Sequence, residues 1–234
     1  MRKRGSSHIE MILSFVIFMI AIGFAFYFFR PGDNSRLVES SFSYLFREIE
    51  KNASSEVLTY SIKINNGSFS DKVIGFNVSG SSLDYHSKVF RTNGDEIESG
   101  KNGEIVFANS PEGWNYTDFV DLVLAEELND STYTGTINED YYKISSSLKK
   151  DVLSEKKLRR LKIFYENNYT KIKKQFNIPN RVNFIFDFRF SDGSEINVEQ
   201  NVPKNLEVLV QNKRLEMLRE SGAIEFGELT IKVW

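Results

Sequence analysis

A single carboxylate, Glu10, stands at the start of a long apolar run near the N-terminus. Three basic residues and a glycine precede it, in the order Arg2-Lys3-Arg4-Gly5, and Glu10 is the fifth residue after that glycine. A carboxylate among apolar side chains costs free energy unless a cation pairs with it. From its placement alone, Glu10 reads as an interfacial charge among headgroups near Arg4.

The apolar run that follows covers residues 11–29, nineteen residues without a charge. As a helix it would be about 28 Å long, close to the hydrocarbon thickness of a bilayer. Its length, and its aromatic end in place of a small-residue cleavage site, favour a retained single-pass transmembrane helix over a cleaved secretory signal. The basic residues before it predict a cytoplasmic N-terminus and a C-terminal domain outside the cell membrane. We therefore expect an anchor over residues 1–31 that contacts the lipid bilayer, and an extracytoplasmic α+β domain over residues 32–234.

These features together resemble the class III signal peptide of archaeal type IV pilin-like, membrane-anchored surface proteins. The resemblance is limited to about the first 29 residues. It implies that a prepilin-type peptidase cuts after Gly5, that Ser6 becomes the first residue, and that Glu10 helps subunits to assemble with themselves or with other pilin-like subunits. The sequence departs from the archaeal pattern at Ser6 and His8, where glutamine and serine are frequent. Pro31 should also interrupt the long stem helix of a pilin.

The rest of the chain predicts helices and strands that pack into one core. Apolar residues recur at helical spacing over residues 36–51 and 154–176. Alternation with a turn at 191–194 predicts a hairpin over residues 182–198. The alternation near the C-terminus changes phase at Gly227, which predicts a bulge or bend. The expected fold class is α+β, with an N-terminal transmembrane helix followed by a mostly antiparallel β-sheet domain with one or two packed helices.

Side chains for catalysis or metal binding are scarce. The chain has no cysteine and two histidines, of which only His86 lies beyond the N-terminal segment. No phosphate-binding glycine motif is present, so we expect no cofactor, no metal site and no enzymatic activity. Beyond residue 31 the chain carries 26 basic and 31 acidic residues, a balance that disfavours nucleic-acid binding.

Six N-x-[ST] sequences are acceptor sites for N-glycosylation, which agrees with an extracellular domain on the cell surface. They begin at Asn52, Asn66, Asn77, Asn115, Asn129 and Asn168. The predicted function is a non-catalytic surface protein, a pilin-like structural subunit of a type IV pilus-like filament or related surface complex. Two alternatives stay open: a signal-anchored monomeric binding or accessory protein, and a surface hydrolase built on carboxylates that leave no motif.

Overall fold

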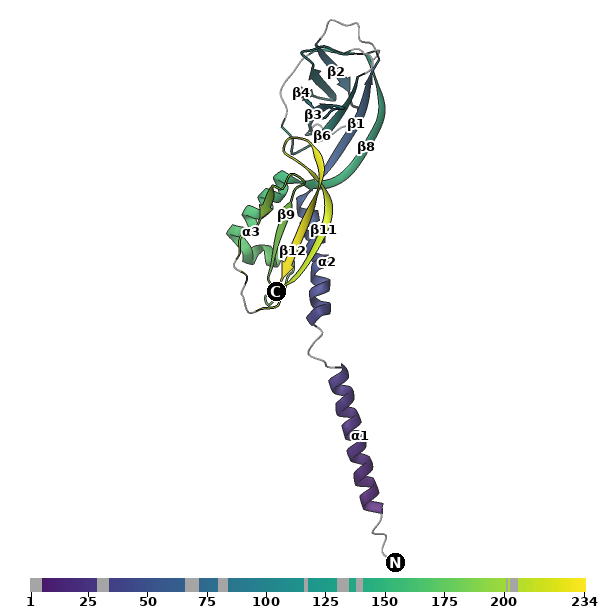
Figure 1. Ribbon diagram of the computed structural model, residues 1–234, viewed down its shortest axis with the longest axis vertical. Coiled ribbons are helices and arrows are strands. Elements are labelled where there is room, and N and C mark those ends of the chain that lie inside the picture. The colour runs from purple at the N-terminus through teal and green to yellow at the C-terminus, as the bar shows by residue number, and fades with distance from the viewer. Residues whose placement is uncertain are drawn as a thin grey trace, which may run out of the picture. The chain divides into compact units, whose positions relative to one another are not determined.

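The computed structural model describes residues 6–28, 34–65, 72–79, 84–115, 118–129, 135–137, 141–200, 202 and 206–234. The chain divides into two compact units, Met1–Ser43 and Tyr44–Trp234. The predicted domain boundary after residue 31 stays a prediction. In chain order the helices and strands are α1 (Ser6–Phe28), α2 (Asn34–Ala53), β1 (Ser54–Ile64), β2 (Val73–Asn77), β3 (His86–Arg91), β4 (Glu96–Asn102), β5 (Ile105–Asn109), β6 (Phe119–Ala125), β7 (Thr136–Ile137), β8 (Tyr142–Ser154), α3 (Glu155–Gln175), β9 (Phe184–Arg189), β10 (Glu195–Asn197), β11 (Leu209–Leu218) and β12 (Ile224–Val233) (Figure 1).

The first unit contains α1, whose side chains are described for residues 10–25. Within the described part of the chain, no helix combines the length and the apolar character that crossing a membrane requires. The predicted N-terminal transmembrane helix is therefore wrong.

In the second unit the strands pair in the order β10-β9-β12-β11-β8-β1-β6-β3-β4-β5-β2-β7. The sheet is mixed, because β11 runs parallel to β8 and β7 runs parallel to β2. The predicted fold class is wrong in its membrane-spanning anchor. The sheet of the described residues is mixed, but nine of its eleven strand pairings are antiparallel. The parallel contact between β8 and β11 depends on a long crossover through α3, β9 and β10, which local patterns do not reveal.

The first half of this unit is built on β1 and β8, which pair antiparallel from Ser54 opposite Leu153 to Ile64 opposite Tyr142. The other edge of β1 pairs with β6, and β6 pairs with β3. Alternate side chains of these strands form one apolar core. At its centre Phe76 makes edge-to-face contacts with Trp114 and Tyr142, with ring centroids 6.2 and 5.2 Å apart.

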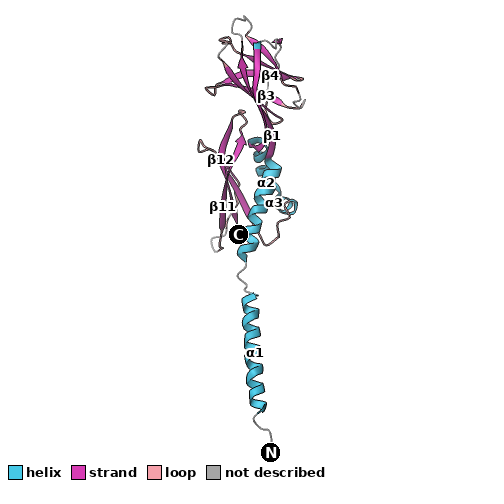
Figure 2. Ribbon diagram, turned by 90° about the vertical axis from the view of Figure 1, so that its right-hand side faces the viewer, coloured by secondary structure: helices cyan, strands magenta, loops and turns pink. Residues whose placement is uncertain are grey.

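The second half packs α3 against one face of the strands β9 and β12. Ser154 caps the N-terminus of α3, as its sequence predicts, by accepting a hydrogen bond from the backbone N–H of Lys157. Tyr165 of α3 lies edge-on to Phe184 and Phe186 of β9, with centroids 5.5 and 5.7 Å apart. The C-terminal part of α2 lies beside the same strands, because Glu50 pairs with Lys213 of β11 (Figure 2).

Within the second unit, neither α3 nor the C-terminal part of α2 lies over the opposite face of β9, β12 and β11 (Figure 2). Strand β12 keeps an unbroken register with β11, so the bulge expected at Gly227 is absent. The phase change arises because Phe226 points to the open face, while Leu229 and Ile231 point to the covered face and are fully buried. Gly227 is required by a close approach, since a Cβ there would lie 2.7 Å from the carbonyl oxygen of Arg189 and would overlap the ring of Phe188.

We expect the substitution Gly227→Ala to destabilise the fold, because the added methyl group overpacks against Phe188 and backbone. Overpacking of this kind lowers the free energy of unfolding by about 2 kcal/mol. Chemical denaturation followed by circular dichroism measures the change. Thr230→Ala, on the open face of the same strand, is the control and should cost much less. Equal stability of Gly227→Ala and the unmodified chain would contradict the close approach.

Candidate functional site

The N-terminal candidate residues fall in and beside α1. The helix begins at Ser6, the residue that cleavage after Gly5 would expose, and Gly5 itself lies outside the described residues. Glu10 is exposed. It lies one turn after Ser6, about 6 Å along the axis. Residues four apart share a helix face, so the expected new amino group and the carboxylate would line up on one side of α1.

The described side chains of α1 that follow Glu10 are apolar except for Ser14, and all but Ile22 are exposed. Met11 is 71% exposed, and its neighbours along two turns are almost equally so. Large apolar residues occupy consecutive positions, so no face of this part of the helix is polar. The exposed set is Met11, Ile12, Leu13, Phe15, Val16, Ile17, Phe18, Met19, Ile20 and Phe24.

Two of the six glycosylation sequences place an exposed asparagine on the surface of the second unit, at Asn115 and Asn129. Asn66 lies outside the described residues. Asn168 is half-buried at a break inside α3, where its φ of −142° and ψ of 44° leave the helical range. The surface therefore presents Asn115 and Asn129 more openly than Asn168.

The remaining two asparagines are held by the fold. Asn52 lies in α2, where its amide nitrogen donates to the carbonyl oxygen of Glu48 at 2.7 Å and its oxygen accepts from Gln175 at 3.1 Å. Asn77 lies in β2 with its side-chain oxygen buried. Modification of either nitrogen would have to compete with this packing.

A cluster of polar groups joins β1, the end of β6 and the start of α3. The buried carboxylate of Glu127 accepts a hydrogen bond from the Ser55 hydroxyl and forms an ion pair with Lys157 at 2.7 Å. Lys157 also donates to the carbonyl oxygen of Ser54 at 2.9 Å. Burial raises the pKa of Glu127, but Lys157 and Ser55 outweigh it and hold this pKa below its ordinary value.

This cluster resembles a serine nucleophile beside a base, but its chemistry favours a structural role. A general base works best with a pKa near the working pH, and the lowered pKa makes Glu127 a weak base. The amino group of Lys157 is committed to two oxygen acceptors, so it is not placed to act as a base for Ser55. The arrangement fixes the start of α3 to β1 and to the end of β6.

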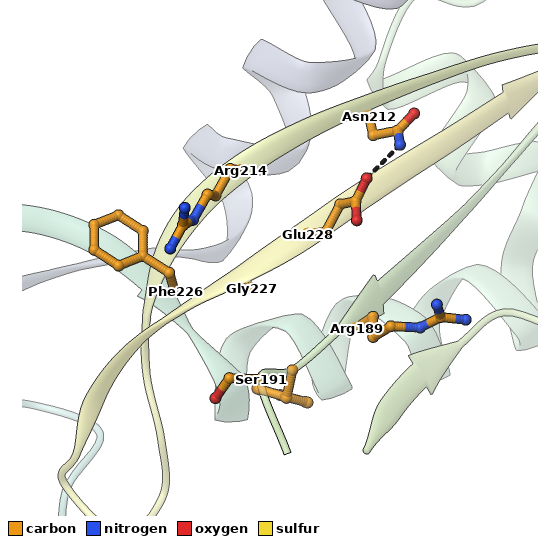
Figure 3. Close-up of a pocket in the computed structure, with 8 residues that line it drawn as sticks. Arg189, Ser191, Asn212, Arg214, Phe226, Gly227 and Glu228 are labelled. Carbon is orange, nitrogen blue, oxygen red and sulfur yellow. Dashed lines mark hydrogen bonds between the residues drawn. The ribbon is translucent and has the colours of Figure 1, made fainter. Parts of the chain in front are cut away.

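A hollow of about 540 Å³ lies on the open face of β9, β12 and β11 (Figure 3). Phe184 and Phe186 point to α3, so alternation along β9 sends Arg189 to this opposite face. The register then places Glu228 of β12 directly opposite Arg189, and Arg214 of β11 directly opposite Glu228. The other lining side chains include Ser191, Asn212 and Phe226.

Charges of alternating sign form a row across this face. Arg189 is committed to Glu195 of β10, with nitrogen and oxygen 2.8 Å apart. The side chain of Asn197 and that of Arg189 hold the pKa of Glu195 below its ordinary value. Glu228 accepts a hydrogen bond from the amide nitrogen of Asn212 (Figure 3). Arg189 and Glu228 therefore both have hydrogen-bonding partners within the fold.

Arg214, at the other end of the row, has a different environment. Its guanidinium stacks over the ring of Phe226 at 4.7 Å from the centroid (Figure 3). Within the described residues, no carboxylate lies at ion-pair distance from Arg214. Phe226 is 49% exposed. A large aromatic side chain is normally buried, so this exposure is unusual. The sequence alone did not identify the contact between Arg214 and Phe226. The change in the phase of the alternation around Gly227 was the feature that could have indicated it.

We expect Glu127→Gln to destabilise the fold at pH 7, because Lys157 loses its buried carboxylate partner. Loss of one member of a buried pair lowers the free energy of unfolding here by about 2 kcal/mol. The pKa of Glu127 is lowered in the folded chain, so its stabilisation is present above the ordinary value of 4.5 and is lost as pH falls through the folded pKa. Denaturation curves from pH 7 to pH 3 should therefore converge for the two proteins.

The control for this prediction is Glu96→Gln, which breaks an exposed pair with Lys88. An exposed pair of this kind contributes about 0.5 kcal/mol or less, so the control should change stability little at any pH. A pH-independent difference between Glu127→Gln and the unmodified chain would contradict the account given for Glu127.

No protein-family model, curated protein or solved structure matches the chain. The N-terminal pattern therefore remains the one family resemblance at hand, and it covers about 29 residues.

Proposed function

We propose that this chain is a pilin-like structural subunit of a type IV pilus-like filament or a related surface complex, with Tyr44–Trp234 displayed outside the cell. The observation that carries the proposal is the exposed, all-round apolar surface of α1 next to Glu10. A helix of this kind requires an apolar environment on every side, because exposed apolar area costs about 25 cal/mol per Å² in water.

Copies of the same helix satisfy this requirement better than a single groove does. A groove covers one face of a helix and leaves the rest exposed, whereas a bundle of sister helices surrounds each member. Consecutive large residues such as Phe15, Val16, Ile17 and Phe18 are exposed in different directions around α1. The geometry therefore favours assembly into a multi-helix core.

The polar end of α1 fits the same assembly. If the chain is cut after Gly5, as the resemblance implies, the new amino group lies at Ser6, where the described helix begins. An ammonium group at that position on one copy can pair with Glu10 of the next copy. Such a pair offsets the cost of holding a carboxylate among apolar side chains and also sets the stagger between neighbours.

The second candidate is a monomeric surface binding protein, and the hollow beside Arg214 and Phe226 favours it. This candidate requires no cleavage after Gly5 and no contact between copies. An uncut N-terminus together with free subunits in mild detergent would support it over the filament.

We expect the mature protein from native cells to begin at Ser6. Mass spectrometry of the N-terminal peptide measures this directly. Gly5→Leu should block the cut, because the peptidase expected from the resemblance requires the small residue there. Protein that begins at Met1 or Arg2 would contradict the processing step.

We expect Glu10→Ala to be processed normally and to fail to assemble, because the carboxylate partner of the neighbouring amino group is lost. Glu10→Gln keeps the shape and removes the charge, so it should fail in the same way. Ser14→Ala, at another exposed polar position of α1, is the control and should assemble. Electron microscopy of surface filaments gives the readout, and filaments of normal number from Glu10→Ala would exclude the role proposed for Glu10.

A further inference from the structure

We propose that the hollow on the open face of β9, β12 and β11 binds an acidic sugar, with the carboxylate held by Arg214 and the sugar ring seated against Phe226. This goes beyond assembly, because every residue involved lies in Tyr44–Trp234 and none lies in α1. Binding at this hollow therefore does not depend on whether the chain assembles into a filament.

The hollow has the size and lining of a site for a small ligand. Its volume is about 540 Å³. Small-molecule sites usually have volumes of about 300–1,000 Å³, so the hollow lies within that range. Its lining combines the exposed ring of Phe226 and the buried Phe190 with polar side chains from three adjacent strands (Figure 3). Strands paired in register give these groups fixed backbone positions, which favours a formed site over a chance depression.

Arg214 supplies a cation that has no ion-pair contact among the described residues, because its cross-strand neighbour Glu228 accepts a hydrogen bond from Asn212 instead. Arg189 already pairs with Glu195, and Arg219 pairs with Glu155 and lies over Phe190 at 3.9 Å. Arg214 instead lies over Phe226, which orients the guanidinium but leaves its N–H donors for a ligand. A planar guanidinium binds a carboxylate with two parallel hydrogen bonds, so a carboxylate suits Arg214 well.

Glu228 restricts the ligand further. Its carboxylate lies opposite Arg214 across the strands and repels a ligand with several negative charges, such as a nucleotide or a nucleic acid. The same oxygens accept hydrogen bonds from hydroxyl groups. A ligand with one carboxylate, several hydroxyl donors and an apolar C–H face matches Arg214, Glu228 and Phe226 together. An acidic sugar has these three features in one ring.

The first experiment compares glucuronate with its methyl ester by isothermal titration calorimetry of the full chain. The ester lacks the negative charge that Arg214 would bind and carries one additional methyl group. We expect the ester to bind at least about tenfold more weakly, because it cannot form the charged pair with the guanidinium. A trisaccharide of two neutral sugars and one terminal glucuronate tests whether the ligand is longer than one ring, and it should bind at least as tightly as glucuronate. Equal binding of the acid and the ester, or no binding of any acidic sugar, would overturn the proposal.

The second experiment uses matched variants. Arg214→Gln and Phe226→Ala should each weaken glucuronate binding about tenfold. Lys63 and Phe119 form a similar exposed cation–ring pair, 6.0 Å apart, away from the hollow. Lys63→Gln and Phe119→Ala should therefore bind like the unmodified chain. Circular dichroism establishes that each variant is folded, and binding that is lost equally in both pairs of variants would overturn the proposal.

Discussion

The antiparallel ladder between β1 and β8 is the interaction on which the rest of the second unit depends. It runs from Ser54 opposite Leu153 to Ile64 opposite Tyr142. On its β6 side it carries the apolar core around Phe76, and at its C-terminal end it leads directly into α3. Because Ser154 both ends the ladder and caps α3, the direction of the helix is set by the strand.

The start of α3 then brings together residues that are distant in the sequence. Lys157 reaches the buried carboxylate of Glu127 and the carbonyl oxygen of Ser54. Glu155, also buried, pairs with Arg159 and with Arg219 from the far end of β11. Charges buried in this way are costly unless every one has a partner, so these pairs tie the two halves of the sheet to one geometry.

One-sided coverage of the β9–β12–β11 sheet explains where the second unit offers a binding surface. α3 packs on one face through Tyr165 and takes up the aromatic side of β9. The other face keeps alternating charges, with Phe226 as its large exposed ring. A sheet face without a helix must carry polar side chains to stay hydrated, and an aromatic ring placed there needs another reason. The contact of Phe226 with Arg214 and its position beside the hollow explain why this ring is exposed.

The sequence by itself determined those helices and turns whose capping, periodicity and turn residues lie within a few residues of each other. The spacing of Leu158, Leu161 and Tyr165 and the cap at Ser154 predicted α3, which ends next to Asn177 with its positive φ of 47°. The turn at Asp192 and Gly193 predicted the β9–β10 hairpin, which the pairing of Ile196 with Phe188 confirms. Capping, periodicity and turn geometry act over one or two turns of chain, so they can be read without knowing the fold.

Only the tertiary structure decided the mixed strand order and the bare face of the sheet. The parallel contact of Met217 with Leu153 joins residues far apart in the chain. The row of Arg214, Glu228 and Arg189 likewise exists only after three strands have paired in one register. Alternation shows that Phe226 and Leu229 point to opposite faces, but it does not show which face a helix will cover. That choice depends on packing between distant segments, which no local pattern contains.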